Sequence, residues 1–275
     1  YRLRTITLTV VLLGLFTYAN AAEITPYGSF NYKWSNDENS SGVSVNKLED
    51  NGSKIGIDID DIGVEGQTVI GFAKLEVGVD TDDSGSNTFD SRLAYVGVEN
   101  NGVAITVGRQ SHPFASVSKT GNFEVYGSNA VFKYGDRSSN TIKLDNGSFA
   151  VMGMVDGSTG EDGLDLWEAS LSHSVSGIDV AAGYADDVVN DISYWGASAS
   201  TTVGDITVAS TYTIKDAATD ITGVELTLGA SIFTVGYQDL ESTGVYYTAG
   251  VSKEIVSSLT AVSYTHLTLP TTPYV

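Results

Sequence analysis

Apolar and polar residues alternate with a period of two over most of the chain, in segments of roughly eight to twelve residues, which is the pattern of half-buried β-strands. The clearest case is 54–60, where Ile55, Ile57 and Ile59 alternate with polar residues and glycine. The same alternation recurs in 67–79, 91–99 and 178–184. Amphipathic helical patterns are missing, and after residue 22 no apolar run approaches the roughly 20 residues that a membrane-spanning helix needs. The pattern predicts an all-β chain.

The connections between these segments are of two kinds. Short ones contain Asn101-Gly102, Asn146-Gly147 and Ser176-Gly177, which are tight hairpin turns. Longer, acidic ones cover 80–90, 156–165 and 186–191. Their alternation predicts an up-and-down antiparallel meander with turns at one end and loops at the other.

Two architectures can use such a meander: a soluble barrel or sandwich with an apolar core, or a membrane barrel with its apolar face towards lipid. About fifteen segments would make a soluble barrel too wide to fill with side chains. Tyr and Trp residues also gather near segment ends, as an aromatic girdle requires. These features favour the membrane barrel, and we expect Ile55, Ile57, Ile59, Leu93 and Tyr95 to point outward.

The first 21 residues carry the signs of a signal peptide. Arg2 and Arg4 form a positive region, residues 6–16 are apolar, and Ala19-Asn20-Ala21 fits a cleavage site. The apolar run is too short for a membrane anchor. We expect export, with the mature chain beginning at Ala22.

Composition narrows the function classes. The chain of 275 residues has 34 acidic and 14 basic residues, a formal charge of −20 and no cysteine. This balance argues against nucleic acid as a partner, and a disulfide scaffold is excluded. The three histidines, His112, His173 and His266, belong to no catalytic or metal-binding motif. We therefore expect neither an enzyme nor a metal or cofactor site, with His112 as a loop residue.

A family resemblance begins at residues 91–114. Ser91–Val98, the Asn100-Asn101-Gly102 turn, Ile105–Gln110 and Pro113-Phe114 resemble the strand pair that leads into the constriction loop of Gram-negative general diffusion porins. Tyr27-Gly28-Ser29, 137–142 and 251–261 resemble flanking strands of that family. The likeness covers about 24–261. It implies a transmembrane antiparallel β-barrel of 16 strands, usually trimeric, with one loop folded into the lumen.

The resemblance also implies a constriction site. The segment of about 110–136 matches the inward-folded loop, and Glu124 matches its acidic position. Lys54, Arg92 and Arg137 match the basic ladder on the facing wall, and each lies on the polar face of its segment, with Arg137 in phase with Thr141 and Lys143. The full expected set of pore-lining residues is Lys33, Lys54, Lys74, Glu76, Arg92, Glu124 and Arg137. The alternative hypothesis is that Arg92 and Arg137 are solvated residues of the wall without a role in selecting solutes.

The last residues depart from the strand pattern. Pro270 and Pro273 lie within the last six residues, and proline is excluded from central strands. We expect a porin barrel over 22–262, truncated at its C-terminus, followed by a non-native tail over 263–275. The alternative is a genuine last strand within 259–269.

These expectations define an outer-membrane porin for passive diffusion of small hydrophilic solutes and ions, mildly cation-preferring because acidic loops concentrate counter-ions. Its partners would be outer-membrane lipid, lipopolysaccharide and two further copies of itself in a homotrimer. A substrate-specific channel and a secreted β-protein such as an adhesin are the alternatives.

Overall fold

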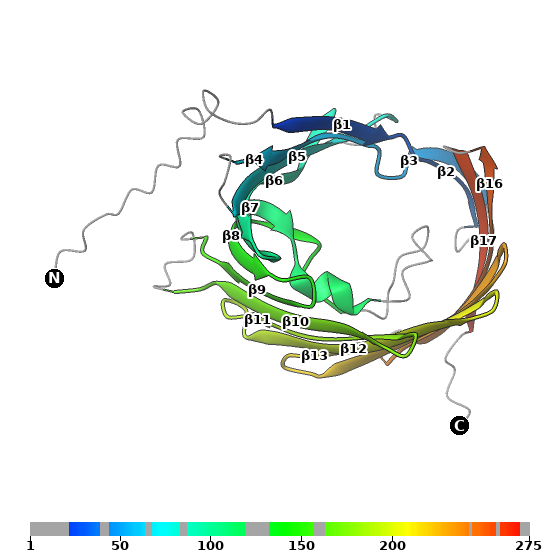
Figure 1. The fold of residues 1–275 in the computed structure, drawn as a ribbon. Helices are drawn as coiled ribbons and strands as arrows, with labels where there is room; N and C mark the ends of the chain where they lie inside the picture. Colours follow the sequence, from blue (N-terminus) through cyan, green and yellow to red (C-terminus); the bar gives the residue numbers. More distant parts are fainter. Residues whose placement is uncertain are drawn as a thin grey trace.

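The computed structural model describes residues 22–38, 44–63, 68–82, 87–118, 132–156, 163–241, 244–256 and 259–269. Figure 1 shows an antiparallel sheet that curves into a ring, with a short helical turn inside it. Among these residues no helix has the length and apolar character needed to cross a membrane. The all-β meander predicted from the alternation is confirmed.

The main sheet has fifteen strands, and β2 and β3 form a separate two-stranded sheet. Strand order follows the sequence from β4 to β17, with β1 beside β4. The strands are β1 (Glu23–Ser29), β2 (Tyr32–Glu38), β3 (Ser44–Asp50), β4 (Lys54–Ile62), β5 (Val69–Val79), β6 (Phe89–Asn100), β7 (Val103–Ser111), β8 (Arg137–Asp145), β9 (Phe149–Met154), β10 (Leu166–Val175), β11 (Ile178–Asp187), β12 (Ile192–Val203), β13 (Ile206–Asp216), β14 (Ile221–Ala230), β15 (Phe233–Leu240), β16 (Gly244–Val256) and β17 (Leu259–Leu269).

The two sheets are parts of one long hairpin. β1 pairs with β4 up to Ser29 and Lys54, and β2 pairs with β3 from Tyr32 and Asp50 onward. The Asn51 N–H donates to the Asn31 carbonyl at 2.8 Å between these two stretches. The hairpin therefore continues from β1 and β4 into β2 and β3, which lie between β1 and β16 in Figure 1, and its register changes at the interruption.

Tight turns and longer connections alternate as expected. The β6–β7 turn has Asn101 at φ 50° and Gly102 at φ 78°, both in the left-handed region that two-residue hairpins of this type require. Ser176 and Gly177 do the same between β10 and β11. The opposite end of the sheet carries the connections 80–88, 112–136 and 155–165, whereas the expected long connection 186–191 is shortened to 188–191 because β11 continues to Asp187. One rim of the ring is thus compact and the other bears the long loops.

Cross-strand pairing fixes which residues share a face, because directly paired side chains point to the same side of a sheet. The inner face is the one against which residues 113–117 pack, inside the ring. On β5, Glu76 lies on this face and is 3% exposed, whereas its neighbour Leu75 on the outer face is 53% exposed. The polar side is therefore turned inward and the apolar side outward, the reverse of a soluble barrel.

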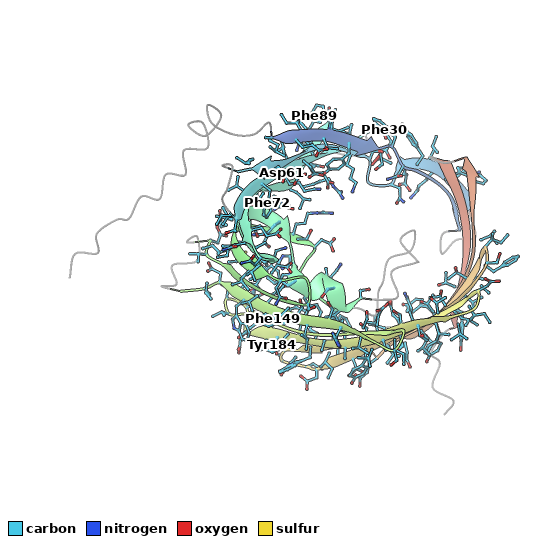
Figure 2. The ribbon with its side chains drawn as sticks, viewed as in Figure 1. Phe30, Asp61, Phe72, Phe89, Phe149 and Tyr184 are labelled. Atoms are coloured by element: carbon cyan, nitrogen blue, oxygen red, sulfur yellow. The ribbon has the colours of Figure 1, made fainter. Side chains whose placement is uncertain are left out.

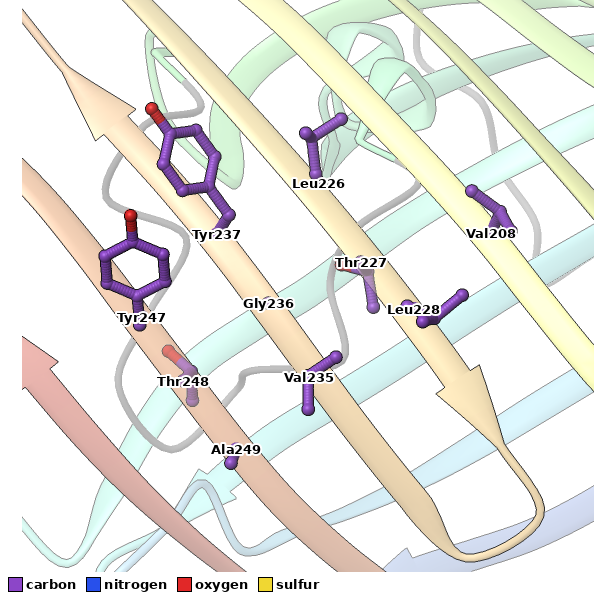
Figure 3. Close-up of a pocket in the computed structure, with 10 residues that line it drawn as sticks. All are labelled: Val208, Leu226, Thr227, Leu228, Val235, Gly236, Tyr237, Tyr247, Thr248 and Ala249. Atoms are coloured by element: carbon purple, nitrogen blue, oxygen red, sulfur yellow. The ribbon is translucent and has the colours of Figure 1, made fainter.

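The outer face is apolar along many strands. Exposed residues on it include Ile55, Ile57, Val107, Leu171 and Leu226. Figure 3 shows one stretch on β13 to β16, where Val208, Leu226, Leu228, Val235, Tyr237 and Tyr247 line a shallow groove. The predicted outward orientation of the isoleucines on β4 is confirmed by this geometry.

One predicted facing is wrong. Lys74 pairs with Tyr95 and Glu76 pairs with Leu93, so Tyr95 and Leu93 lie on the inner face. A register irregularity follows, since Val77 pairs with Ser91 and leaves Arg92 as the extra residue of a β-bulge. The bulge lets Arg92 reach the inner face as well. Strict alternation had assigned Arg92 and Leu93 to opposite faces.

Candidate functional site: a charged wall and an inward-folded loop

A charged cluster lies on the inner face of β4, β5 and β6. Arg92 Nε donates to Glu76 Oε1 at 2.7 Å, and Lys54 Nζ lies 3.3 Å from Glu76 Oε2. The Tyr27 hydroxyl donates to the same Oε2 at 3.0 Å. One buried carboxylate thus joins two of the expected basic residues.

A second pair extends this cluster along the wall. Lys74 Nζ lies 2.8 Å from Asp58 Oδ1 and 4.6 Å from the centre of the Tyr27 ring. Asp58 and Lys74 are cross-strand partners, so their contact follows directly from the register. Opposite charges alternate across this part of the inner wall, and each basic side chain is held in place by a carboxylate. Side-chain positions defined in this way can maintain a fixed field in a water-filled space.

Arg137 joins the same electrostatic environment from the start of β8. It lies within electrostatic range of Arg92, Asp136 and Glu76. The expectation that Arg137 lies on the same face as Thr141 and Lys143 is wrong. Gly108 pairs with Thr141, but two residues on, Gln110 pairs with Ser138, so β8 contains an extra residue between these pairs. Ser138, rather than Ser139, therefore shares the face of Thr141. The structure brings Lys54, Glu76 and Arg92 together, with Lys74 beside them. Arg137 pairs with Ser111, which by register places its backbone position on the face opposite to Ser138, so its expected place on the inner wall stays a prediction.

Two expected residues are not placed. Glu124 lies outside the described residues, as does the side chain of Lys33, whose backbone belongs to β2. The acidic side of the expected constriction therefore stays a prediction.

The beginning of the loop is fixed by a buried carboxylate on β10. His112 Nδ1 lies 2.6 Å from Glu168 Oε1, and the Phe114 N–H donates to Glu168 Oε2 at 3.2 Å. His112 Nε2 lies 3.0 Å from Ser138 Oγ on β8. Glu168 is completely buried. These contacts hold the chain where it leaves β7 and turns inward.

The short helical turn η2 (Pro113–Val117) then packs against the wall. Phe114 and Val117 are fully buried and form a cluster with Ala185 and Tyr194 of β11 and β12. The turn contacts β9, β10, β11 and β12, all on one side of the ring. Figure 2 shows the side chains of this wall. Residues 112–117 therefore lie inside the ring, as the expected constriction loop requires.

The returning end of the same connection is attached further along the wall. The Phe132 N–H donates to Thr213 Oγ1 on β13 at 3.1 Å. Lys133 forms an ion pair with Asp136 shortly before β8 begins. The hydrogen bond from Lys133 lowers the pKa of the Asp136 carboxyl, so this carboxylate stays charged at neutral pH. Both ends of the connection are thus anchored to the inner wall.

Several residues that shape this site were not expected from the sequence. Tyr27 and Asp58 complete the charged cluster, and Glu168, Gly183, Gly196 and Thr213 hold the loop. Alternation alone would have put Glu168 on a polar face, but its buried role depends on the loop that covers it. The described residues contain no group of three or more His, Cys, Asp or Glu side chains able to bind a metal ion.

A sheet rolled into a ring, apolar outside and polar inside, with a loop folded inward beside a charged wall, defines the class of channel-forming membrane β-barrels. The chain belongs to the Gram-negative porin family, whose sequence model matches residues 7–267. It is accordingly an outer-membrane channel protein built as a transmembrane β-barrel.

Solved structures share this fold at low sequence identity. The anion-selective porin from Comamonas acidovorans is 16% identical, with a TM-score of 0.66 and coverage of 86% of each chain. OmpF from Salmonella typhi, in complex with daunomycin, is 13% identical, with a TM-score of 0.69 and coverage of 90% of this chain and 91% of that one. The trimer form of OmpT from Vibrio cholerae is 16% identical, with a TM-score of 0.61 and coverage of 90% and 89%. No curated protein sequence matches the chain significantly.

Proposed function

We propose that the channel allows passive diffusion of small hydrophilic solutes and ions, selected by size and charge. The observation that carries this proposal is the anchoring of residues 112–117 and 132–136 to the inner wall, next to the cluster of Lys54, Glu76 and Arg92. A loop held inside a ring narrows the path, and charges along the path orient polar solutes. No bond chemistry is needed for this transport.

The proposed pore-lining residues are those expected from the sequence: Lys33, Lys54, Lys74, Glu76, Arg92, Glu124 and Arg137. We assign the narrowest part to the region between the basic wall and Glu124 on the loop. Glu76 and Asp58 offset much of the positive charge of their lysine and arginine partners. With the chain's charge of −20, this compensation supports a mild preference for cations.

The proposed assembly is a homotrimer in the outer membrane, in contact with lipid and lipopolysaccharide. The trimer form of the similar OmpT from Vibrio cholerae supports the trimer. The apolar outer face of the ring suits lipid contact. Export through a signal peptide over 1–21, a barrel over 22–262 and a non-native tail over 263–275 belong to the same proposal. The pairing of β17 with β16 from Leu259 to Leu269 and the family match up to residue 267 favour the alternative for the last boundary, a genuine strand within 259–269.

Reversal potentials in a salt gradient across a planar lipid bilayer test the selectivity. The wild-type channel is expected to prefer cations, and Glu124→Gln should shift the reversal potential towards anions because it removes the acidic group of the loop. Asp205→Asn, in the β12–β13 turn, is the control and should leave the potential unchanged. Anion preference of the wild-type channel would overturn the proposed selectivity.

A further inference from the structure

Two glycines on neighbouring strands form a shallow seat for the inward-folded loop. Gly183 of β11 and Gly196 of β12 are direct cross-strand partners on the inner face. A Cβ atom on Gly183 would lie 2.7 Å from Val117 Cγ2, and one on Gly196 would lie 2.7 Å from Val117 Cγ1. Either Cβ would also lie 3.0 Å from the ring of Phe114. Neither strand could carry a side chain here without displacing the loop.

Backbone conformation does not explain these glycines. Gly183 and Gly196 are not among the glycines with positive φ, so their backbone suits any residue. Glycine within a strand costs stability and often marks a place where another part of the chain approaches closely. The close approach here is made by Val117 and Phe114, which are 0% and 1% exposed. Lack of a side chain is therefore the property that the seat requires.

A side chain added at Gly183 or Gly196 can displace the helical turn in one direction only. Behind the two glycines stands the hydrogen-bonded wall of β11 and β12, which pair along ten residues each. The backbone of the turn is tied to Glu168 next to it, so the turn cannot slide freely along the wall. A larger residue in the seat must push the turn away from the wall and towards the middle of the ring.

We infer that Gly183 and Gly196 set the width of the channel, by letting residues 113–117 lie flat against the inner wall. This inference rests on the proposed diffusion function and makes the two glycines positioning residues for permeation. Width then depends on the fit between Val117 and this glycine pair, in addition to the charged residues around the path.

A size-exchange experiment tests the fit by single-channel conductance. Gly196→Ala is expected to lower the conductance roughly twofold, because the turn moves into the path. Combining it with Val117→Ala should restore most of the wild-type conductance, since this change removes the γ-methyl group of Val117 that lies nearest to the new Cβ, at 2.7 Å. Restoration separates a displaced loop from general damage to the barrel.

Gly229→Ala is the matched control. Gly229 pairs with Thr207 on the inner face of β14, but the nearest atoms to its added Cβ lie 3.9 Å away. Its conductance should equal that of the wild type. Equal conductance of Gly196→Ala and wild type, or failure of Val117→Ala to restore it, would overturn the inference.

A cross-link tests the seat without any current. The chain has no cysteine, so Val117→Cys with Gly196→Cys introduces the only pair. Because a Cβ on residue 196 would lie 2.7 Å from Val117 Cγ1, the Cβ atoms of the two cysteines come within the range of disulfides. Mass spectrometry of the oxidised, folded protein should find this cross-link, and the pair Val117→Cys with Gly229→Cys should give none. Absence of the first cross-link would overturn the seat, whereas a cross-linked but non-conducting protein would instead count against the diffusion function.

Discussion

Glu76 is the residue on which the charge balance of the inner wall depends. It is nearly fully buried and accepts contacts from Arg92, Lys54 and Tyr27. Removing one member of a buried charged group leaves the others without compensation, which is more costly than loss of an exposed ion pair. The two cations would then act on passing ions at full strength.

Glu76→Gln tests this charge balance. The substitution keeps the size of the side chain and removes its charge, so the reversal potential should shift towards anions. The free energy of unfolding in lipid vesicles should fall by about 3 kcal/mol, because Arg92 and Lys54 lose a buried partner. Asp205→Asn serves again as the remote control. An unchanged potential would show that Lys54, Glu76 and Arg92 do not face the ion path.

At the residue scale the sequence placed Lys54, Lys74 and Glu76 correctly on one face, because β4 and β5 keep strict alternation through these positions. The sequence could not predict which side chains these three residues contact. The contact of Glu76 with Arg92 depends on the register between two strands, and that register includes a bulge. A pattern along one segment carries no information about such an offset.

At the scale of elements, the bulge in β6 decides which side chains reach the interior. The bulge sets Leu93 and Tyr95 inward with Arg92, and Ala94 and Val96 outward. Leu93 and Tyr95 were expected to face lipid because they are apolar, yet Tyr95 packs edge-on against Phe72 on the inner face. Apolar residues beside a loop-lined channel can thus imitate a lipid-facing stripe.

Cysteine labelling tests this assignment. Since the chain has no cysteine, single variants Leu93→Cys and Ala94→Cys each carry one thiol. A charged thiol reagent that cannot enter lipid should label Leu93→Cys in membranes and leave Ala94→Cys unlabelled. Labelling of Ala94→Cys but not of Leu93→Cys would contradict this assignment and would mean that Leu93 points towards lipid, as strict alternation predicts.

The loop illustrates a second limit of prediction. Its position between the strands 105–110 and 137–142 was expected from the resemblance and from its length. Its anchors were not, because Gly183, Gly196 and Glu168 lie on three other strands and become its neighbours only after the ring forms. In the sequence these glycines look like other small residues of a β-strand.

At the scale of the whole molecule, the folded state depends on contact between the exposed apolar outer face and membrane lipid. Leu226 is exposed on the outer face of β14, next to the buried, inward Glu225. Leu226→Arg should lower the free energy of unfolding in lipid vesicles by about 2–4 kcal/mol, because it places a charge in the hydrocarbon region. Denaturant titration measures this change.

Ser200→Arg is the control for that substitution. Ser200 pairs with Asp179 on the inner face, where water and a carboxylate can receive the new charge. Its effect on unfolding should be small. If both arginine variants were equally stable, the outer face would not be the face that contacts lipid.

The central claim is diffusion through a water-filled path, and liposome swelling with a series of uncharged sugars tests it most directly. Liposomes that contain the protein should swell at rates that fall steadily as the sugar becomes larger, with no saturation by any one sugar. Swelling with a single sugar only, or swelling that saturates at low concentration, would contradict the account and favour a substrate-specific channel.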